Sequence, residues 1–195
     1  MNYKGILFFL GINSLLISIF SVINILYSIY FDFIIDLNSY LLTFLISVFI
    51  GLIFYLIGRN HSKDISLIEQ IIFILLSFIL IPCLISIPYI FSIYDMDLLN
   101  SYFESVSGFT ATGFSVFEDI NNINEPLVLW RSSSQWMGGL FFLLVTIGTI
   151  GSKQIKIKPA YLISGGASGR NFYNNFFSNF IKILLIYLSL TLFVI

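Results

Sequence analysis

A stretch rich in serine, threonine and glycine holds the residues of this sequence best suited to chemistry: ESVSGFTATGFSVFEDINNINEPLVLWRSSSQWMGG, residues 104–139. Its centre is TATGF, which comprises Thr110, Ala111, Thr112, Gly113 and Phe114. Glycine adopts backbone angles closed to other residues, so Gly113 allows nearby carbonyls to turn toward one axis. Backbone carbonyls arranged in a ring replace the hydration shell of a potassium ion. The pattern therefore predicts a cation site made of backbone, and the alternative is an ordinary Thr/Gly turn.

The composition around this segment is that of a membrane protein. The 195 residues are 58% hydrophobic and 10% charged, with a mean hydropathy of +0.98, whereas soluble domains carry about 25% charged residues. A single cysteine, Cys83, rules out an internal disulfide. It lies in an apolar run, where we expect it to be a small buried residue.

Five apolar runs predict membrane-spanning helices, which need about 20 mostly apolar residues. They cover residues 6–30, 40–57, 66–93, 127–150 and 176–195. Pro82 and Pro88 predict a kink in the second half of the third run. The fold expected is an all-α integral membrane protein. Its parts are an amino-terminal hairpin (1–60), one helix–pore loop–helix repeat (61–152), a cytoplasmic loop (153–175) and the start of a further helix (176–195).

The charges orient these spans, because basic residues mark cytoplasmic loops. One side would carry Lys4, Arg59, Lys63, Lys153, Lys156, Lys158 and Arg170, and the other Asp32, Asp36, Asp95, Asp97, Glu118, Asp119 and Glu125. We therefore expect a multi-pass protein of the cytoplasmic membrane with its amino terminus in the cytoplasm. The acidic outer loops would raise the cation concentration at a pore mouth, or are simply the complement of the basic inner loops.

Residues 95–126 must begin and end outside for five spans to alternate. Asp97 is a candidate N-cap for a short helix. This helix is too short to span, and it leads into the Thr/Gly segment and back outside. Non-helical backbone at membrane depth is tolerated where protein buries it or where it lines a water-filled cavity. The segment is thus a predicted re-entrant pore loop, whose helix directs its negative C-terminal end toward a cation.

Three polar side chains are candidate supports of this loop. A carboxylate at membrane depth is costly unless it is paired, so Glu104 would bind amides near the filter or meet the cation Arg131; the alternative is a solvated position at the outer mouth. Gln135 follows Arg131 by one helical turn. Trp130 and Trp136 are expected either at the membrane interface or packed against the pore helix, and Gly138 and Gly139 would allow close helix approach.

Three motifs in order resemble the first pore repeat of the TrkH/KtrB potassium uptake proteins, which are grouped with the HKT transporters. They are PYIFS at 88–92, SYFESVSGFTATGFSV at 101–116 and LWRSSSQWMGG at 129–139. The resemblance implies that Gly113 corresponds to the third position of the channel signature TVGYG, with the carbonyls of Thr110, Ala111 and Thr112 as potassium ligands. It further implies a dimer and a cytoplasmic nucleotide-binding regulatory subunit, and no cofactor besides the transported ion.

A full subunit of that family has four such repeats, whereas this chain has one Ser-Gly-x-Thr-x-x-Gly segment. We therefore expect an amino-terminal portion of a transporter. The alternatives are a channel built from four copies of a single-repeat chain and a truncated membrane protein that does not transport. A membrane enzyme is disfavoured, because the chain has one histidine (His61, expected in a solvated loop), one cysteine and no clustered carboxylates in the spans. GGASGR lacks the lysine of a phosphate loop, and nothing indicates a nucleic-acid partner.

Overall fold

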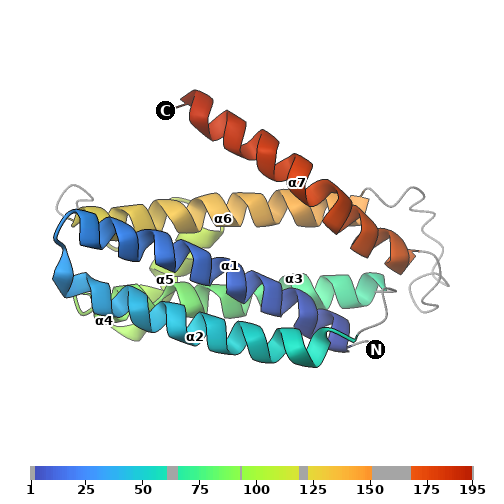
Figure 1. The fold of residues 1–195 in the computed structure, drawn as a ribbon, viewed down its shortest axis with the longest axis horizontal. Helices are drawn as coiled ribbons and strands as arrows, with labels where there is room; N and C mark the ends of the chain where they lie inside the picture. Colours follow the sequence, from blue (N-terminus) through green and yellow to red (C-terminus); the bar gives the residue numbers. More distant parts are fainter. Residues whose placement is uncertain (1–2, 61–65, 93, 119–122, 151–167, 195) are drawn as a thin grey trace.

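The computed structural model describes residues 3–60, 66–92, 94–118, 123–150 and 168–194, and all regular structure in these ranges is α-helical. The long helices up to residue 150 run side by side along one axis, and the last helix crosses them at an angle (Figure 1). His61 and most of the predicted cytoplasmic loop lie outside the described residues.

The amino-terminal hairpin pairs α1 (Tyr3–Tyr30) with α2 (Ile34–Gly58) along their full length (Figure 1). Glycines let the two backbones touch: a Cβ added at Gly58 would lie 2.5 Å from the amide nitrogen of Phe8, and one at Gly11 2.7 Å from that of Tyr55. Beyond these contacts, toward its carboxyl-terminal end, α1 buries a polar stripe that consists of Asn13, Ser14, Ser18, Ser21, Asn24 and Ser28. Small residues at a helix interface allow this close packing in a membrane.

The third predicted span is broken near its end, as its prolines indicated. α3 (Leu67–Ile85) begins with a capping box between Ser66 and Glu69, and α4 (Ile87–Phe91) follows after a single residue, Ser86. The indole nitrogen of Trp130 donates to the carbonyl of Ile85 at this break, at 3.0 Å. The expectation that Cys83 is buried is wrong: it lies on an exposed face of α3.

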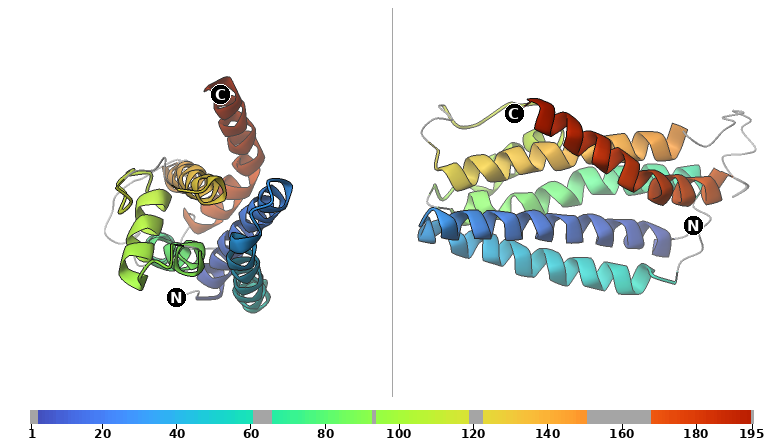
Figure 2. Two further views of the ribbon diagram at one scale, coloured as in Figure 1. Left: turned by 90° about the vertical axis from the view of Figure 1, so that its left-hand side faces the viewer. Right: turned by 45° about the horizontal axis from the view of Figure 1, so that its top comes forward.

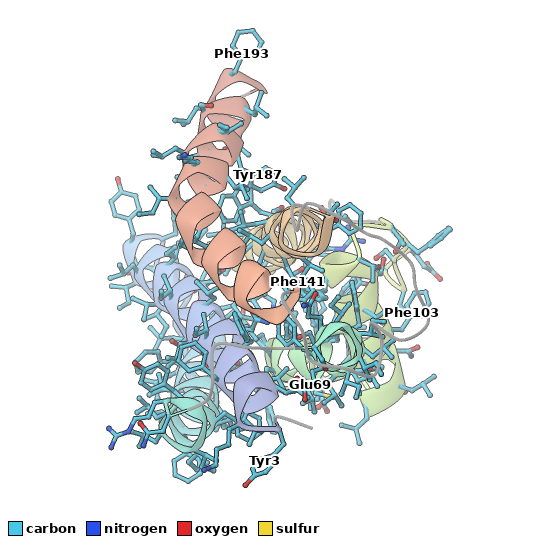
Figure 3. All side chains as sticks on the ribbon, turned by 90° about the vertical axis from the view of Figure 1, so that its right-hand side faces the viewer. Tyr3, Glu69, Phe103, Phe141, Tyr187 and Phe193 are labelled. Carbon is cyan, nitrogen blue, oxygen red and sulfur yellow. The ribbon has the colours of Figure 1, made fainter. Side chains whose placement is uncertain are left out.

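The pore-loop region contains α5 (Leu98–Phe109) and α6 (Glu125–Ile150), which lie against each other, with α5 also against α3 (Figure 2). Asp97 is the N-cap of α5, but its side chain makes no capping hydrogen bond. α7 (Ser168–Val194) begins eight residues before the predicted start at 176. Its carboxyl-terminal half leaves the bundle, and Phe193 at its end is 89% exposed (Figure 3).

Three helical stretches in the described residues are long and apolar enough to cross a membrane: Tyr3–Tyr30, Asp36–Gly58 and Ile68–Phe91. The predicted runs at 127–150 and 176–195 fall only in part on residues whose side chains the structure describes, so these two spans stay predictions. The apolar stretch found in α7, Phe180–Phe193, is shorter.

Aromatic rings fill the core where α1, α3, α5 and α6 meet. The rings of Phe73 and Phe109 both contact Phe141, with centroids 5.9 and 5.4 Å apart, and Phe9 packs on Phe73 at 5.4 Å. Phe141 lies inside the bundle, whereas Phe103 faces outward from α5 (Figure 3). This core fixes the C-terminal end of α5, from which the Thr/Gly loop begins.

Candidate ion-filter site

The end of α5 is a Schellman motif, which forms the start of the predicted filter. Thr110 is the C-cap and Ala111 follows with a left-handed φ of 55°. The amide of Ala111 donates to the carbonyl of Gly108 at 2.9 Å, and that of Thr112 to the carbonyl of Ser107 at 3.1 Å. Glycine is the usual residue at the left-handed position, and alanine there is strained. The helix therefore ends at Phe109, and the carbonyls of Ser107 and Gly108 accept hydrogen bonds within the turn.

The loop Thr110–Phe114 lies on the surface of the described chain. All five residues are exposed, and Gly113 has a φ of 82°. A Cβ added at Gly113 would meet no atom within 4 Å. The requirement for glycine here is therefore one of backbone angle and not of space. Thr110 and Ala111 border a groove of about 390 Å³ together with Phe78, Phe109, Gly138, Gly139 and Phe142.

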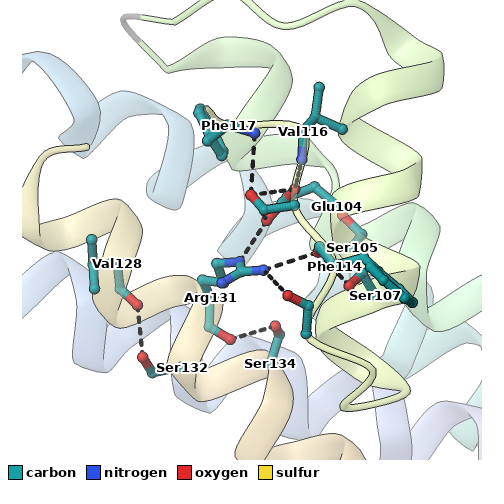
Figure 4. A network of polar contacts seen from close by, with 12 residues as sticks. Glu104, Ser105, Ser107, Phe114, Val116, Phe117, Val128, Arg131, Ser132 and Ser134 are labelled. Atoms are coloured by element: carbon teal, nitrogen blue, oxygen red, sulfur yellow. Dashed lines mark hydrogen bonds and ion pairs between the residues drawn. The ribbon is translucent and has the colours of Figure 1, made fainter. Parts of the chain in front are cut away.

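A buried ion pair lies behind this loop. Glu104 is 0% exposed, and its Oε1 is 2.5 Å from Nε of Arg131, whose side chain is 10% exposed. The carboxylate also accepts from the Ser115 hydroxyl, at 3.2 Å, and from the amide of Val116, at 3.0 Å. Glu104 is therefore buried and not solvated at the outer mouth, and it contacts both the amide of Val116 and the guanidinium of Arg131 (Figure 4).

Arg131 joins α6 to the loop. Besides Glu104, its guanidinium donates through Nη2 to the carbonyl of Phe114 at 3.0 Å and, at the longer distance of 3.4 Å, to that of Gly113 (Figure 4). By contrast, no hydrogen bond from a described residue reaches the carbonyls of Thr110, Ala111 or Thr112. The carbonyl oxygens of Gly113 and Phe114 thus accept from Arg131, whereas those of Thr110, Ala111 and Thr112 have no donor among the described residues.

Hydroxyl groups connect the loop to α5. Ser107, which is 3% exposed, donates to the carbonyl of Phe114 at 2.5 Å. The Thr112 hydroxyl lies 3.2 Å from the Ser107 hydroxyl and 3.3 Å from that of Thr110. Sequence reasoning passed over Ser107, because a lone serine two residues from a helix end carries no signal of its own.

The contact between α5 and α6 leaves no room for a side chain at Gly138, and a side chain at Gly108 would require the Ser134 hydroxyl to move. A Cβ added at Gly138 would lie 1.8 Å from the carbonyl oxygen of Phe109, and one at Gly108 2.3 Å from the Ser134 hydroxyl. Ser134 is buried and donates to the carbonyl of Arg131 at 2.7 Å. The prediction that Gly138 permits close helix approach is confirmed, and the helix it approaches is α5, the predicted pore helix.

The amino-terminal end of α6 is joined to the amino-terminal hairpin by hydrogen bonds. Asn124 precedes this helix; its side-chain nitrogen donates to the buried carboxylate of Asp36, and its Oδ1 accepts from the amide of Leu127 at 3.3 Å. The backbone amide of Asn124 donates to the Tyr94 hydroxyl at 2.8 Å. The sequence placed Asp36 among the outer charges, and no local pattern predicted its hydrogen bond with Asn124.

The other predicted residues lie apart from this network. Gln135 is half-buried on α6, and no hydrogen bond joins it to the described residues around Arg131. Trp130 is buried and packs on Tyr40 of α2, with ring centroids 5.7 Å apart, a partner that neither expectation included. Trp136 packs between Phe20 and Tyr187.

Comparison with known proteins shows similarity to potassium uptake proteins; no protein-family model matches the chain. It is 33% identical over 75 residues to the Trk system potassium uptake protein TrkI of Halomonas elongata, covering 38% of this chain and 15% of that protein. It is 26% identical over 150 residues to an uncharacterised cation transporter of Methanocaldococcus jannaschii, covering 74% and 30%. It is 23% identical over 109 residues to the Trk system protein TrkH of Salmonella typhimurium, covering 55% and 23%.

These matches establish distant homology to part of the Trk potassium uptake proteins, and the matched proteins are transporters by name rather than enzymes. The chain spans between 15% and 30% of the length of these three relatives. Together with its candidate membrane spans, the homology indicates a membrane protein concerned with potassium or cation transport.

Proposed function

We propose that this distant homologue of the Trk potassium uptake proteins supplies one pore segment of a potassium-conducting filter. The carbonyls of Thr110, Ala111 and Thr112 would contact the ion, with Gly113 and Phe114 completing the strand. The observation that carries the proposal is the division of backbone oxygens in the loop. Arg131 and Ser107 hold the later carbonyls from behind, while the three earlier ones have no donor among the described residues.

The mechanism is replacement of hydration rather than covalent chemistry. Carbonyl oxygens substitute for water around the ion, which then passes down its electrochemical gradient. Left-handed backbone at Ala111 and Gly113, with other angles between them, allows successive carbonyls to turn to one side instead of alternating as in a strand. One such loop provides part of a ring. The exposure of all five loop residues supports completion of the ring by further pore segments, whether further repeats or further copies.

The dimer and the cytoplasmic nucleotide-binding regulatory subunit remain predictions from the family resemblance. Gln135 likewise remains a predicted support, reaching the filter only through the packing of α6. Glu104 and Arg131 are the supports with contacts: their ion pair fixes the limb that returns from the filter.

The first prediction concerns orientation, with the loop that follows the filter outside and the end of α2 inside. Single cysteines at Glu118 and Arg59, both exposed, are introduced in a Cys83→Ser background, because Cys83 is itself exposed. An impermeant thiol reagent applied to whole cells should label Glu118→Cys and spare Arg59→Cys until the cells are opened. Equal labelling of the two sites in whole cells would refute the orientation.

The second prediction tests the filter through Gly113. A φ of 82° costs a residue other than glycine about 1–3 kcal/mol, so Gly113→Ser should shift the loop carbonyls while the protein still inserts. Rubidium uptake, with sodium as competitor, is measured in cells lacking potassium uptake. The hosts are the chain itself and a TrkH chimera that carries it in place of the aligned segment. We expect the preference for rubidium over sodium to fall about tenfold or more in the Gly113→Ser chimera, each tenfold being about 1.4 kcal/mol.

Val116→Ser serves as the control, because it places the same side chain in the same loop at an exposed position that has no left-handed φ. It should retain wild-type selectivity. The chain by itself should carry rubidium only if copies assemble around a common axis, which crosslinking detects. Unchanged selectivity in the Gly113→Ser chimera would place the filter elsewhere.

A further inference from the structure

Ser107 occupies the position where the pore helix turns back on its own loop. It lies in the last turn of α5 and is 3% exposed. Its hydroxyl contacts two residues of the loop, the carbonyl of Phe114 at 2.5 Å and the Thr112 hydroxyl at 3.2 Å. Its own carbonyl accepts from the amide of Thr112 at 3.1 Å. One residue of the helix therefore holds the loop on both sides of Gly113.

Counting hydrogens fixes the direction of these contacts. A serine hydroxyl has a single hydrogen, and the Phe114 carbonyl, which only accepts, takes it. In its contact with Thr112 the Ser107 hydroxyl can therefore only accept. The Thr110 hydroxyl donates its own hydrogen to the carbonyl of Val106, at 2.7 Å, so it too can only accept from Thr112. The Thr112 hydroxyl is thus the donor of this group, and its one hydrogen has three acceptors within 3.3 Å: the Ser107 hydroxyl, the Ser107 carbonyl and the Thr110 hydroxyl.

Hydrogen bonds, and not packing, determine the conformation between these two anchors. Gly113 has open space around its Cα, and Phe114 is 70% exposed. On the side of α6, Arg131 holds the Phe114 carbonyl at 3.0 Å. On the side of α5, the Ser107 hydroxyl is the side-chain group that reaches it among the described residues. Loss of this hydroxyl removes the tie between α5 and the Phe114 carbonyl, while Glu104 of α5 still holds the Val116 amide and the Ser107 carbonyl still accepts from Thr112.

We infer that Ser107 is a positioning residue for ion selectivity: its hydroxyl holds the Phe114 carbonyl at the pore helix, and thereby sets the placement of the carbonyls that precede Phe114. This inference rests on the proposed function, because it assigns those carbonyls to the ion. Ser107 does not contact the ion and acts through Thr112 and Phe114. Discrimination between potassium and sodium depends on the number and placement of coordinating carbonyls, so a small displacement alters selectivity more than overall rate.

The test compares Ser107→Ala with Ser105→Ala in the TrkH chimera. Ser105 lies on the same helix and is 0% exposed, but its hydroxyl donates only to the carbonyl of Ser101 in the preceding turn, at 2.7 Å. Both variants lose one buried hydroxyl, but only Ser107→Ala loses a hydrogen bond to the loop. We expect Ser107→Ala to lower the preference for rubidium over sodium about tenfold, as loss of one hydrogen bond of this kind warrants, with Ser105→Ala near wild type. Thr112→Val should shift selectivity in the same direction, and Ser107→Thr, which keeps the hydroxyl, should restore most of it.

A second measurement separates this inference from the proposed function. Amide hydrogen exchange over residues 110–117 is followed in the purified chain in detergent, where no transport is needed. Ser107→Ala should exchange faster there than Ser105→Ala and Ser107→Thr. Equal exchange in the two alanine variants, or equal ion selectivity, overturns the role of Ser107 even if the wild type transports rubidium. Absence of rubidium uptake by the wild-type chimera, with faster exchange confined to Ser107→Ala, refutes the proposed function and leaves the positioning role.

Discussion

Glu104→Gln is expected to lower the stability of the chain by about 3–5 kcal/mol. The glutamine removes the charge that Arg131 faces, and Arg131 cannot regain water because its side chain is only 10% exposed. It also exchanges a carboxylate oxygen, which accepts from Val116 and Ser115, for a group that donates on one side. The apparent melting temperature in detergent, followed by fluorescence-detected size exclusion, measures the loss.

Two further variants make the result specific. Glu125→Gln removes an exposed carboxylate from the first turn of α6, where its interaction with the helix N-terminus is worth about 0.3–1 kcal/mol. Adding Arg131→Met to Glu104→Gln removes the uncompensated charge and should recover part of the loss, as expected for two residues in contact. If Glu104→Gln melted at the temperature of Glu125→Gln, the ion pair would contribute nothing, and the view that it supports the loop would have to be abandoned.

Gly138→Ala is expected to separate α6 from the pore helix, whereas Gly139→Ala is expected to be neutral or stabilising. The added methyl group at position 138 would lie 1.8 Å from a backbone oxygen of Phe109 and 2.6 Å from its carbonyl carbon. Since neither is a flexible side chain, a whole helix must shift, at a cost of about 1–3 kcal/mol or more. At position 139 the methyl group meets the Tyr187 hydroxyl at 2.4 Å, the end of a side chain that can swing aside.

Gly139→Ala thus serves as the control for Gly138→Ala, because both add one methyl group to the same turn of α6. Alanine gains about 1 kcal/mol over glycine in a helix interior, which should appear in full at Gly139 and be outweighed at Gly138. Melting temperatures in detergent and rubidium selectivity of the chimera are compared for the pair. Equal stability of the two variants would mean that α5 and α6 do not meet as closely as the structure places them.

The sequence predicted the helical, membrane-embedded nature of the chain, the short helix before the Thr/Gly segment and the two partners considered for Glu104. These features rest on local signals, namely apolar runs, a candidate N-cap and a carboxylate that cannot remain unpaired at membrane depth. The filter assignment remains a prediction. A left-handed backbone conformation could be expected at Gly113 from its residue type, but not at Ala111, which also has a positive φ.

The sequence could not show which face of each helix is buried, and the predictions for Gln135 and Cys83 required that knowledge. Gln135 was predicted to support the loop, but successive residues of a helix are rotated by about 100°. Ser134, one position earlier, is the residue that faces α5 and touches Gly108. Cys83 was expected inside because its neighbours are apolar, yet in a membrane protein apolar residues also cover the outside. The contact between Asp36 and Asn124 joins residues 88 positions apart, beyond the reach of any local pattern.

During synthesis, α1 leaves the ribosome before α2 exists to cover its stripe of asparagine and serine. The stripe is buried in the finished chain, and its Ser21 donates to the carbonyl of Tyr40 on α2. Insertion of α1 alone would present these groups to lipid, whereas insertion as a pair brings Gly11 and Gly58 into backbone contact at once. We therefore expect the hairpin to be a unit of biogenesis, in which α1 and α2 enter the bilayer together before the helices that pack on them.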